Sequence, residues 1–302
     1  MWCPLQRLLL NPLMQPARVG VEPEWTRADF VAQALRVAAR LRETRPRAVA
    51  LHFSDAARMA CAFLACAHEG VAMVLPPNLA ADNLAWASER ADVWMTDGHT
   101  PSQAREVANA AQAAGDAQAG RGNIEVWTLT DEAILVEALH GNLSAQTAQT
   151  AQTAQTAQTA QTAHIAEKHA SCSVSNADDL KGAGQVPAHL LNLDTEVWLK
   201  TSGSTGQPQI IGKTVAQFQA EAEALAQCWG LADEAPVDAV VGSVSPQHLY
   251  GLSFRVVLAL CAGWPIHRMQ CVYPESLLAA ARGSSDAPKR LDLQPDAARR
   301  AG

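Results

Sequence analysis

The sequence LKTSGSTGQPQIIGKT, residues 199–214, decides how this chain is interpreted. Glycines and hydroxyl side chains dominate its first half. Residues 193–199 before it predict a strand, and residues 215–229 after it have the apolar spacing of a helix. Glycine lets a backbone approach a ligand closely, and the N–H groups and hydroxyls of such a loop can bind anionic oxygens. The stretch therefore predicts a phosphate-binding loop between a strand and a helix.

The N-terminal third alternates strands and helices. Residues 48–53, 71–75 and 93–95 are short apolar runs that predict strands, while residues 55–68 and 80–90 predict helices. Alternation at this spacing is typical of βαβ units with a parallel sheet. We therefore expect an α/β fold class, made of parallel-sheet βαβ subdomains interrupted by a low-complexity insertion.

The remaining elements follow from the same patterns. We expect strands at residues 124–129, 193–199, 239–244 and 264–269, and helices at residues 26–43, 131–139, 215–229, 252–261 and 275–282. Residues 1–20 are expected to hold a short helix and a turn. The tail from Gly283 is polar and is expected to end without a core-like element.

Composition divides the chain into three predicted segments. Residues 1–98 form a first α/β subdomain, residues 99–190 a variable region, and residues 191–302 a truncated subdomain with the phosphate loop. The variable region contains a perfect Ala-Gln-Thr repeat at residues 145–163. A period of three has no hydrophobic face to bury and cannot offset the entropy of ordering, so we expect a disordered insertion or linker.

Charge and cysteine content exclude some classes. The chain of 302 residues has a net charge of −7 and a pI of about 5.7, whereas a general nucleic-acid binder needs a basic face. No apolar run is long enough to predict a membrane span. The seven cysteines are scattered, odd in number and without a Cys-x-x-Cys pair. The cysteines are therefore expected to be reduced thiols of a cytoplasmic protein. The negative net charge predicts no nucleic-acid partner.

Two kinds of phosphate loop compete for this stretch. The ending Gly212-Lys213-Thr214 suits the P-loop of nucleoside triphosphatases, which needs four residues between its first glycine and Gly-Lys-Thr. Here five residues separate Gly206 from Gly212, and one of them is Pro208, which has no N–H to donate. The count favours the upstream glycine and hydroxyl residues as the phosphate site.

Residues 201–208, TSGSTGQP, resemble the signature Thr-Ser-Gly-Ser-Thr-Gly-x-Pro-Lys of the adenylate-forming (AMP-binding) superfamily. That superfamily includes acyl- and aryl-CoA synthetases, nonribosomal peptide adenylation domains and luciferases. Residues 244–255, VSPQHLYGLSFR, resemble the His-x-x-Gly segment that lines its acyl pocket. The form around His248 is most similar to acyl-AMP ligases of aryl-polyene and fatty-acid-type biosynthesis. The resemblance implies the N-terminal part of such an enzyme.

The resemblance implies two-step chemistry. A fatty or aryl carboxylic acid attacks the α-phosphate of ATP in the presence of Mg²⁺, which releases pyrophosphate and gives an acyl-adenylate. The acyl group then passes to the thiol of CoA or of a carrier-protein phosphopantetheine. It also implies that His248 lies near the substrate carboxylate or in the pocket wall. The residues implied in phosphate binding are Thr201, Ser202, Gly203, Ser204, Thr205 and Gly206.

The chain departs from the family pattern in two ways. Gln209 replaces the lysine of the signature, which weakens pyrophosphate stabilisation without abolishing it, and Lys200 and Lys213 flank the loop and could supply charge. The family's magnesium, ribose and adenine residues come later than this sequence extends. We therefore expect a fragment or frame-disrupted product that is inactive or nearly so on its own.

No metal site is predicted within the chain. His52 and His68 have no carboxylate or second histidine at ligand spacing. His164, His169 and His189 lack the tight spacing of a metal-binding tract. The Mg²⁺ ligands are expected outside residues 1–302.

Three functions remain open from the sequence. The chain is an acyl-adenylating ligase or its N-terminal part, a non-catalytic remnant that binds nucleotide or acyl ligand, or an interaction protein that works through its Ala-Gln-Thr insertion. The acid, the thiol acceptor and the oligomeric state are left undefined.

Overall fold

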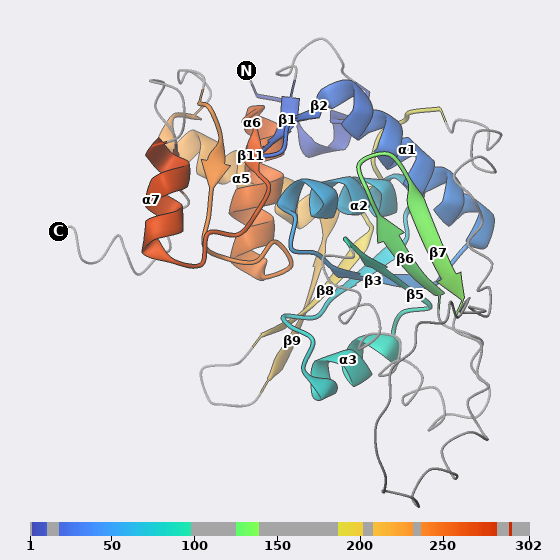
Figure 1. The fold of residues 1–302 in the computed structure, drawn as a ribbon. Helices are drawn as coiled ribbons and strands as arrows, with labels where there is room; N and C mark the ends of the chain where they lie inside the picture. The colour runs from blue at the N-terminus through green and yellow to red at the C-terminus, as the bar shows by residue number, and fades with distance from the viewer. Residues whose placement is uncertain are drawn as a thin grey trace, which may run out of the picture.

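The computed structural model describes residues 2–10, 18–97, 125–138, 187–201, 208–231, 237–282 and 290–291. Most strands belong to a seven-stranded sheet (Figure 1). In spatial order its strands are β7 (Ile134–Ala138), β6 (Glu125–Leu129), β5 (Val93–Thr96), β3 (Ala48–His52), β4 (Ala72–Leu75), β8 (Glu196–Thr201) and β9 (Gln209–Thr214).

The interior of this sheet is parallel. β3 pairs in parallel with both β4 and β5, β4 pairs in parallel with β8, and β5 pairs in parallel with β6. Only the outermost strands, β7 and β9, run antiparallel to their neighbours. The helix α2 (Ala56–Glu69) connects β3 to β4, and α3 (Ala81–Ser88) connects β4 to β5. The predicted α/β class with βαβ units is confirmed.

Both faces of the seven-stranded sheet are covered. Alternate side chains of β3 enter different cores, since Val49 and Leu51 belong to the large core and Ala48 and Ala50 to a smaller one. Figure 1 shows α1 (Arg27–Thr44) and α2 over one face and α3 over the other. Strands buried on both faces read as continuous apolar runs, which is why the sequence identified them.

The helix α2 lies at the centre of the molecule. Its side chains are buried all around its circumference, from Ala56 to His68 with the exception of Arg58. Small residues allow this, because they let neighbouring helices and strands approach from every side. The carboxylate of Asp55 caps the first turn, and Gly70 ends the helix with a positive φ of 70°. Both ends agree with the sequence expectation.

A five-stranded sheet joins the two ends of the chain. In spatial order it contains β12 (Arg290–Leu291), β10 (Val240–Val241), β11 (Ile266–His267), β1 (Arg18–Val21) and β2 (Trp25–Thr26). Both sheets thus take strands from residues 1–98 and from residues 191–302. The division into segments 1–98, 99–190 and 191–302 stays a prediction.

Two sequence expectations are corrected. Residues 131–139 are expected as a helix, but residues 134–138 form β7, because the open edge of β6 offers a partner and the β-branched Ile134 and Val136 favour a strand. The polar tail contributes β12, which pairs with β10. The short helix and turn expected near the N-terminus are present at residues 5–10, and β1, which the sequence did not predict, begins at Arg18 and pairs in parallel with β11.

The remaining helices are η1 (Leu5–Arg7), α5 (Val215–Trp229), η4 (Gly251–Leu258), α6 (Ala259–Ala262) and α7 (Pro274–Arg282). Among them, η4 contacts α2, α5 and α6, while α7 contacts β10 of the five-stranded sheet. The helix η4 is a π-helix, a wide form that proteins use rarely and often at functional sites. Within the described parts of the chain, no helix has the length and apolar character needed to span a bilayer.

Candidate functional site

The signature loop, which we define as residues 201–209, connects β8 to β9, and its first and last residues are the final pair of the β8–β9 ladder. Thr201 and Gln209 are opposite each other in the antiparallel ladder, and the hydroxyl of Thr201 lies 3.4 Å from the carbonyl oxygen of Gln209. The two ends of the loop are therefore held side by side at a polar, solvent-facing edge of the sheet. The predicted phosphate residues Ser202, Gly203, Ser204, Thr205 and Gly206 lie outside the described residues.

The hairpin argues against a P-loop of the triphosphatase kind. In that motif Gly-Lys-Thr opens a helix whose first N–H groups surround phosphate. Here Gly212 and Lys213 lie within β9, where they pair with Trp198 and Val197 of β8. Thr214 caps α5 and forms a capping box with Gln217. The structure therefore agrees with placing any phosphate site upstream of Gly212.

Lys213 is directed to a different partner. Its ammonium lies 2.6 Å from a carboxylate oxygen of Glu221 on α5 and 4.9 Å from the ring centroid of Phe218. The other oxygen of Glu221 accepts a hydrogen bond from Ser253 of η4 at 3.3 Å. Lys213 is also four ladder positions from Gln209, or about 13 Å along the strand. Lys213 thus helps to join β9, α5 and η4, and its role as a phosphate ligand stays a prediction.

His248 lies in the turn that leads into η4. Its backbone N–H donates to the carbonyl of Ser245, and its carbonyl accepts from Leu252. Two buried side-chain atoms here, Nδ1 of His248 and Oε1 of Gln247, have no hydrogen-bond partner among the described residues. Burial lowers the pKa of His248, so its imidazole is neutral at neutral pH. Buried polar atoms are normally paired, so this turn is suited to receive a polar ligand group.

Aromatic rings extend from His248 along η4 toward α5. The ring of His248 stacks with Tyr250 at 5.9 Å, Tyr250 with Phe254 at 6.3 Å, and Phe254 with Trp229 at 6.0 Å. Tyr250 and Trp229 are 45% and 51% exposed. We call these four residues the ring ladder. The sequence placed Tyr250 in packing and did not single out Trp229 or Phe254, because ring-to-ring contact across two helices leaves no local sequence pattern.

The geometry of η4 depends on one glycine. A Cβ atom on Gly251 would overlap the backbone carbonyl oxygen of Ser245. The turn at residues 245–248 can therefore fold back onto the helix only because position 251 has no side chain. This explains in physical terms why the His-x-x-Gly segment ends in glycine.

Metal ligands were not expected from the sequence. The structure nevertheless brings His68, Glu69 and His189 together, although His189 is 121 residues from His68. The expectation that the Mg²⁺ ligands lie outside residues 1–302 stays a prediction.

Comparison with known proteins gives a consistent result. A family profile described as "AMP-binding enzyme" matches residues 11–281. A stretch of 83 residues is 36% identical to a 4-coumarate–CoA ligase from Rhodobacter capsulatus, and it covers 28% of this chain and 21% of that protein.

Solved structures resemble the chain in fold. ATP-bound MatB from Rhodopseudomonas palustris matches with a TM-score of 0.60 and 18% identity, over 94% of this chain and 48% of that one. The o-succinylbenzoate CoA synthetase MenE from Bacillus subtilis, in a complex with its acyl-adenylate intermediate, matches with a TM-score of 0.55 and 16% identity. That match covers 93% of this chain and 60% of MenE. The chain thus spans about half to three fifths of the length of these relatives.

Proposed function

The chain belongs to the AMP-binding enzyme family, and on that premise we propose that it serves in the ATP-dependent activation of a carboxylic acid as an acyl-adenylate. The observation that carries the proposal is the β8–β9 hairpin. It holds the two ends of the signature loop, Thr201 and Gln209, side by side at an exposed edge of the sheet. A glycine and hydroxyl loop closed in this way can surround a triphosphate with backbone N–H groups.

The residue types of the signature loop are suited to a nucleoside triphosphate. When bound, ATP supplies the adenylyl group and a pyrophosphate leaving group. The signature loop, with the hydroxyl of Thr201, would hold the β- and γ-phosphates and limit their movement. Gln209 would donate a neutral amide N–H where the family signature has a lysine. A neutral hydrogen bond contributes about 0.5–1.5 kcal/mol, against about 1.5–3 kcal/mol for one with a charged group, so pyrophosphate is held less strongly.

The turn at His248 would orient the acid. A neutral imidazole with its proton on Nδ1 can donate a hydrogen bond to one carboxylate oxygen, and that atom is buried and has no partner among the described residues. The exposed rings of Tyr250 and Trp229 would receive the apolar part of a fatty or aryl acid. Transfer to the thiol of CoA or of a carrier protein completes the proposed cytoplasmic reaction.

Carboxylate-dependent exchange of pyrophosphate into ATP tests the proposal. The chain covers about half of MatB, so we expect the 302-residue chain alone to give exchange at or near background. Binding of ATP with Mg²⁺ should nevertheless be measurable by calorimetry and weakened by Thr201→Val, which removes one hydroxyl and keeps a β-branched strand residue. ATP binding that is absent, or that is unchanged in the variant, would count against the proposal.

A second reading is a remnant of such a ligase that binds ligands without turnover. The observation that favours it is Gln209, which removes one positive charge from the phosphate site. The same two measurements separate the readings, because a remnant binds nucleotide and shows no exchange with any fatty or aryl acid, even when a longer gene product is tested.

A further inference from the structure

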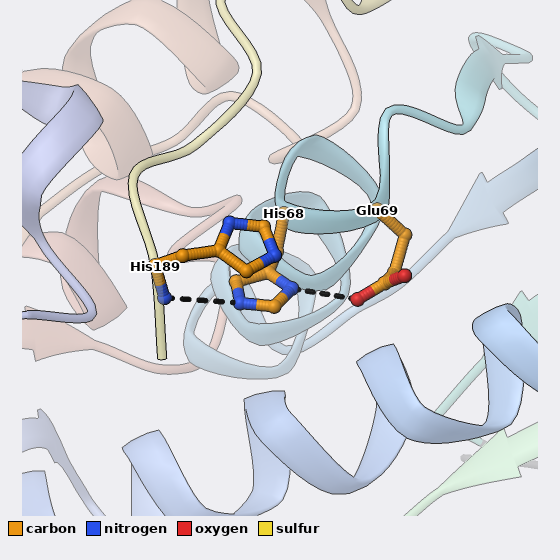
Figure 2. A group of neighbouring side chains, drawn as sticks. All are labelled: His68, Glu69 and His189. Carbon is orange, nitrogen blue, oxygen red and sulfur yellow. Dashed lines mark hydrogen bonds and ion pairs between the residues drawn. The ribbon is translucent and has the colours of Figure 1, made fainter. Parts of the chain in front are cut away.

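The side chain of His68, at the end of α2, is completely buried and forms two hydrogen bonds of opposite sense (Figure 2). Its Nδ1 lies 2.7 Å from a carboxylate oxygen of Glu69. Its Nε2 lies 3.3 Å from the backbone N–H of His189, and a backbone N–H can only donate. Nε2 must therefore accept, so the ring proton is on Nδ1 and the imidazole is neutral.

The ring of His189 lies over the ring of His68. Their centroids are 3.5 Å apart and their planes differ by 24° (Figure 2). Two further backbone N–H groups of this segment are bonded: Leu191 donates to the carbonyl of Gln6 at 3.0 Å, and Asn192 donates to that of Ala67 at 2.8 Å. His68 is thus one of three anchors for residues 189–192, which lead into β8 and the signature loop.

Three charged or titratable side chains surround His68. Glu69 accepts a hydrogen bond from Nδ1 of His68, and the exposed ring of His189 stacks on the ring of His68. Arg42 of α1 forms two 3.0 Å hydrogen bonds with Glu69. Burial is the main cause that lowers the pKa of His68; Glu69 opposes the shift, while His189 and Arg42 add to it. A second positive charge in this group is therefore unfavourable.

The same residues could be read as a metal site, because ligand atoms of His68, Glu69 and His189 lie within 4.8 Å of one another. Two imidazoles and a carboxylate are suitable donors for zinc. However, Nδ1 of His68 holds the ring proton, and Nε2 already accepts a hydrogen bond from the backbone N–H of His189. Arg42 forms hydrogen bonds with both oxygens of Glu69. A metal ion would have to displace a proton and a guanidinium group, so the hydrogen-bond geometry favours a different role.

We propose that His68 and His189 form a proton-sensitive clasp, which holds the segment leading into β8 against the end of α2 while His68 is neutral. Protonation of His68 places an N–H on Nε2, directly opposite the N–H of His189. Two donors then face each other, and the hydrogen bond between α2 and this segment is lost. The loss of this anchor loosens the segment that leads into β8 as pH falls, and this role is independent of the proposed ligase activity.

Hydrogen exchange on the full chain tests the clasp. The exchange rates of the amides of His189, Leu191 and Asn192 are measured at pH 7.5 and 5.5 and corrected for the intrinsic effect of pH. Burial lowers the folded-state pKa of His68, so we expect protection of these amides to fall as pH drops from the ordinary value of about 6.5 toward that lowered pKa, by up to about tenfold for each pH unit in this window. Unchanged protection in the wild-type chain would overturn the proposal.

Two variants make the result specific. The glutamine of His68→Gln can still accept a hydrogen bond from the N–H of His189 but cannot titrate. The exchange protection of the three amides in this variant should therefore not depend on pH. His52→Gln, which removes another histidine with a lowered pKa, should retain the response of the wild-type chain. If amide protection falls equally in acid in the wild-type chain and in His68→Gln, the cause is general unfolding, and the clasp is refuted. Circular dichroism establishes that each variant is folded.

His189→Ala gives a second route if His68→Gln does not fold. It removes the exposed ring and keeps the backbone N–H, so the acid response of the Leu191 and Asn192 amides should persist. Calorimetry with Zn²⁺ at pH 7.5 distinguishes the clasp from a metal site formed by the same residues. No stoichiometric binding is expected; binding of one ion that is lost in both His68→Gln and His189→Gln would overturn the clasp in favour of a metal site.

Discussion

Arg268 and Asp55 form an ion pair that is almost fully shielded from solvent. Nε of Arg268 lies 2.7 Å from Oδ2 of Asp55, and the two side chains are 0% and 3% exposed. Arg268 also contacts both carboxylate oxygens of Asp131, in the turn between β6 and β7, at 2.6 and 2.7 Å. Since Asp55 caps α2 and Arg268 follows β11, this pair fastens the five-stranded sheet to the central helix.

We predict that Arg268→Gln strongly destabilises the fold. The variant leaves Asp55 buried beside a neutral amide, and breaking a buried pair in this way costs about 3–5 kcal/mol. Urea unfolding followed by circular dichroism measures the change. The matched control is Arg47→Gln, which removes an arginine that is 63% exposed and paired with Asp92, and which should cost no more than about 1 kcal/mol. Similar losses in both variants would contradict the structural role of the buried pair.

Gly251→Ala should be damaging for a steric reason. The new Cβ would overlap the carbonyl oxygen of Ser245, and backbone cannot move aside as a flexible side chain can. We expect a loss at or above the upper end of the about 1–3 kcal/mol typical of overpacking, with loss of the near-ultraviolet signal of the ring ladder. Gly230→Ala is the control, since nothing lies within 4 Å of its position and only its φ of 64° is unfavourable for alanine. A thermal melt of Gly251→Ala that resembles that of Gly230→Ala would refute this explanation.

Stability should fall as the solution becomes mildly acidic. Burial lowers the folded-state pKa of His52, His68 and His248 below the ordinary value of about 6.5. Below pH 6.5 the unfolded chain therefore binds more protons than the folded chain, and the free energy of unfolding decreases as pH falls toward the folded pKa values. The contribution of these groups is fully present above pH 6.5. Urea titrations from pH 8 to pH 5 measure it, and a flat profile over this range would contradict the assignment of neutral, buried histidines.

The sequence predicted the βαβ elements well because their signals are local. The buried strands β3, β4 and β5 are continuous apolar runs, and α2 has both a capping Asp55 and a terminating Gly70. Residues 131–139 misled the prediction because they include good helix formers, while the decisive fact is the open edge of β6. The two-residue strands β10 and β11 lie within the strands expected at residues 239–244 and 264–269. Strand β12 depends on a partner far away in the chain, so no local pattern marks it.

The candidate site divides in the same way. The motif located the signature loop and His248, because both are defined by residues close together in sequence. Contacts between distant segments were missed, including the ion pair of Lys213 with Glu221 and the hydrogen bond between His189 and His68. A flanking lysine looks equally available for phosphate in the sequence whether or not a carboxylate on the next helix has already paired with it.

Gln209→Lys should strengthen nucleotide binding. The position is exposed at the end of the hairpin, directly opposite Thr201, so a lysine there is accommodated without repacking. Replacing a neutral hydrogen bond with a charged one gains about 1 kcal/mol, which is roughly fivefold in affinity for ATP or pyrophosphate. Calorimetry measures the gain, and Gln227→Lys, an exposed change on α5, controls for the added charge alone. The gain should shrink as salt rises, because an exposed ammonium acts partly through screened attraction. If both variants bind ATP with the same affinity, position 209 does not contact the phosphates, and the hairpin end is not the nucleotide site.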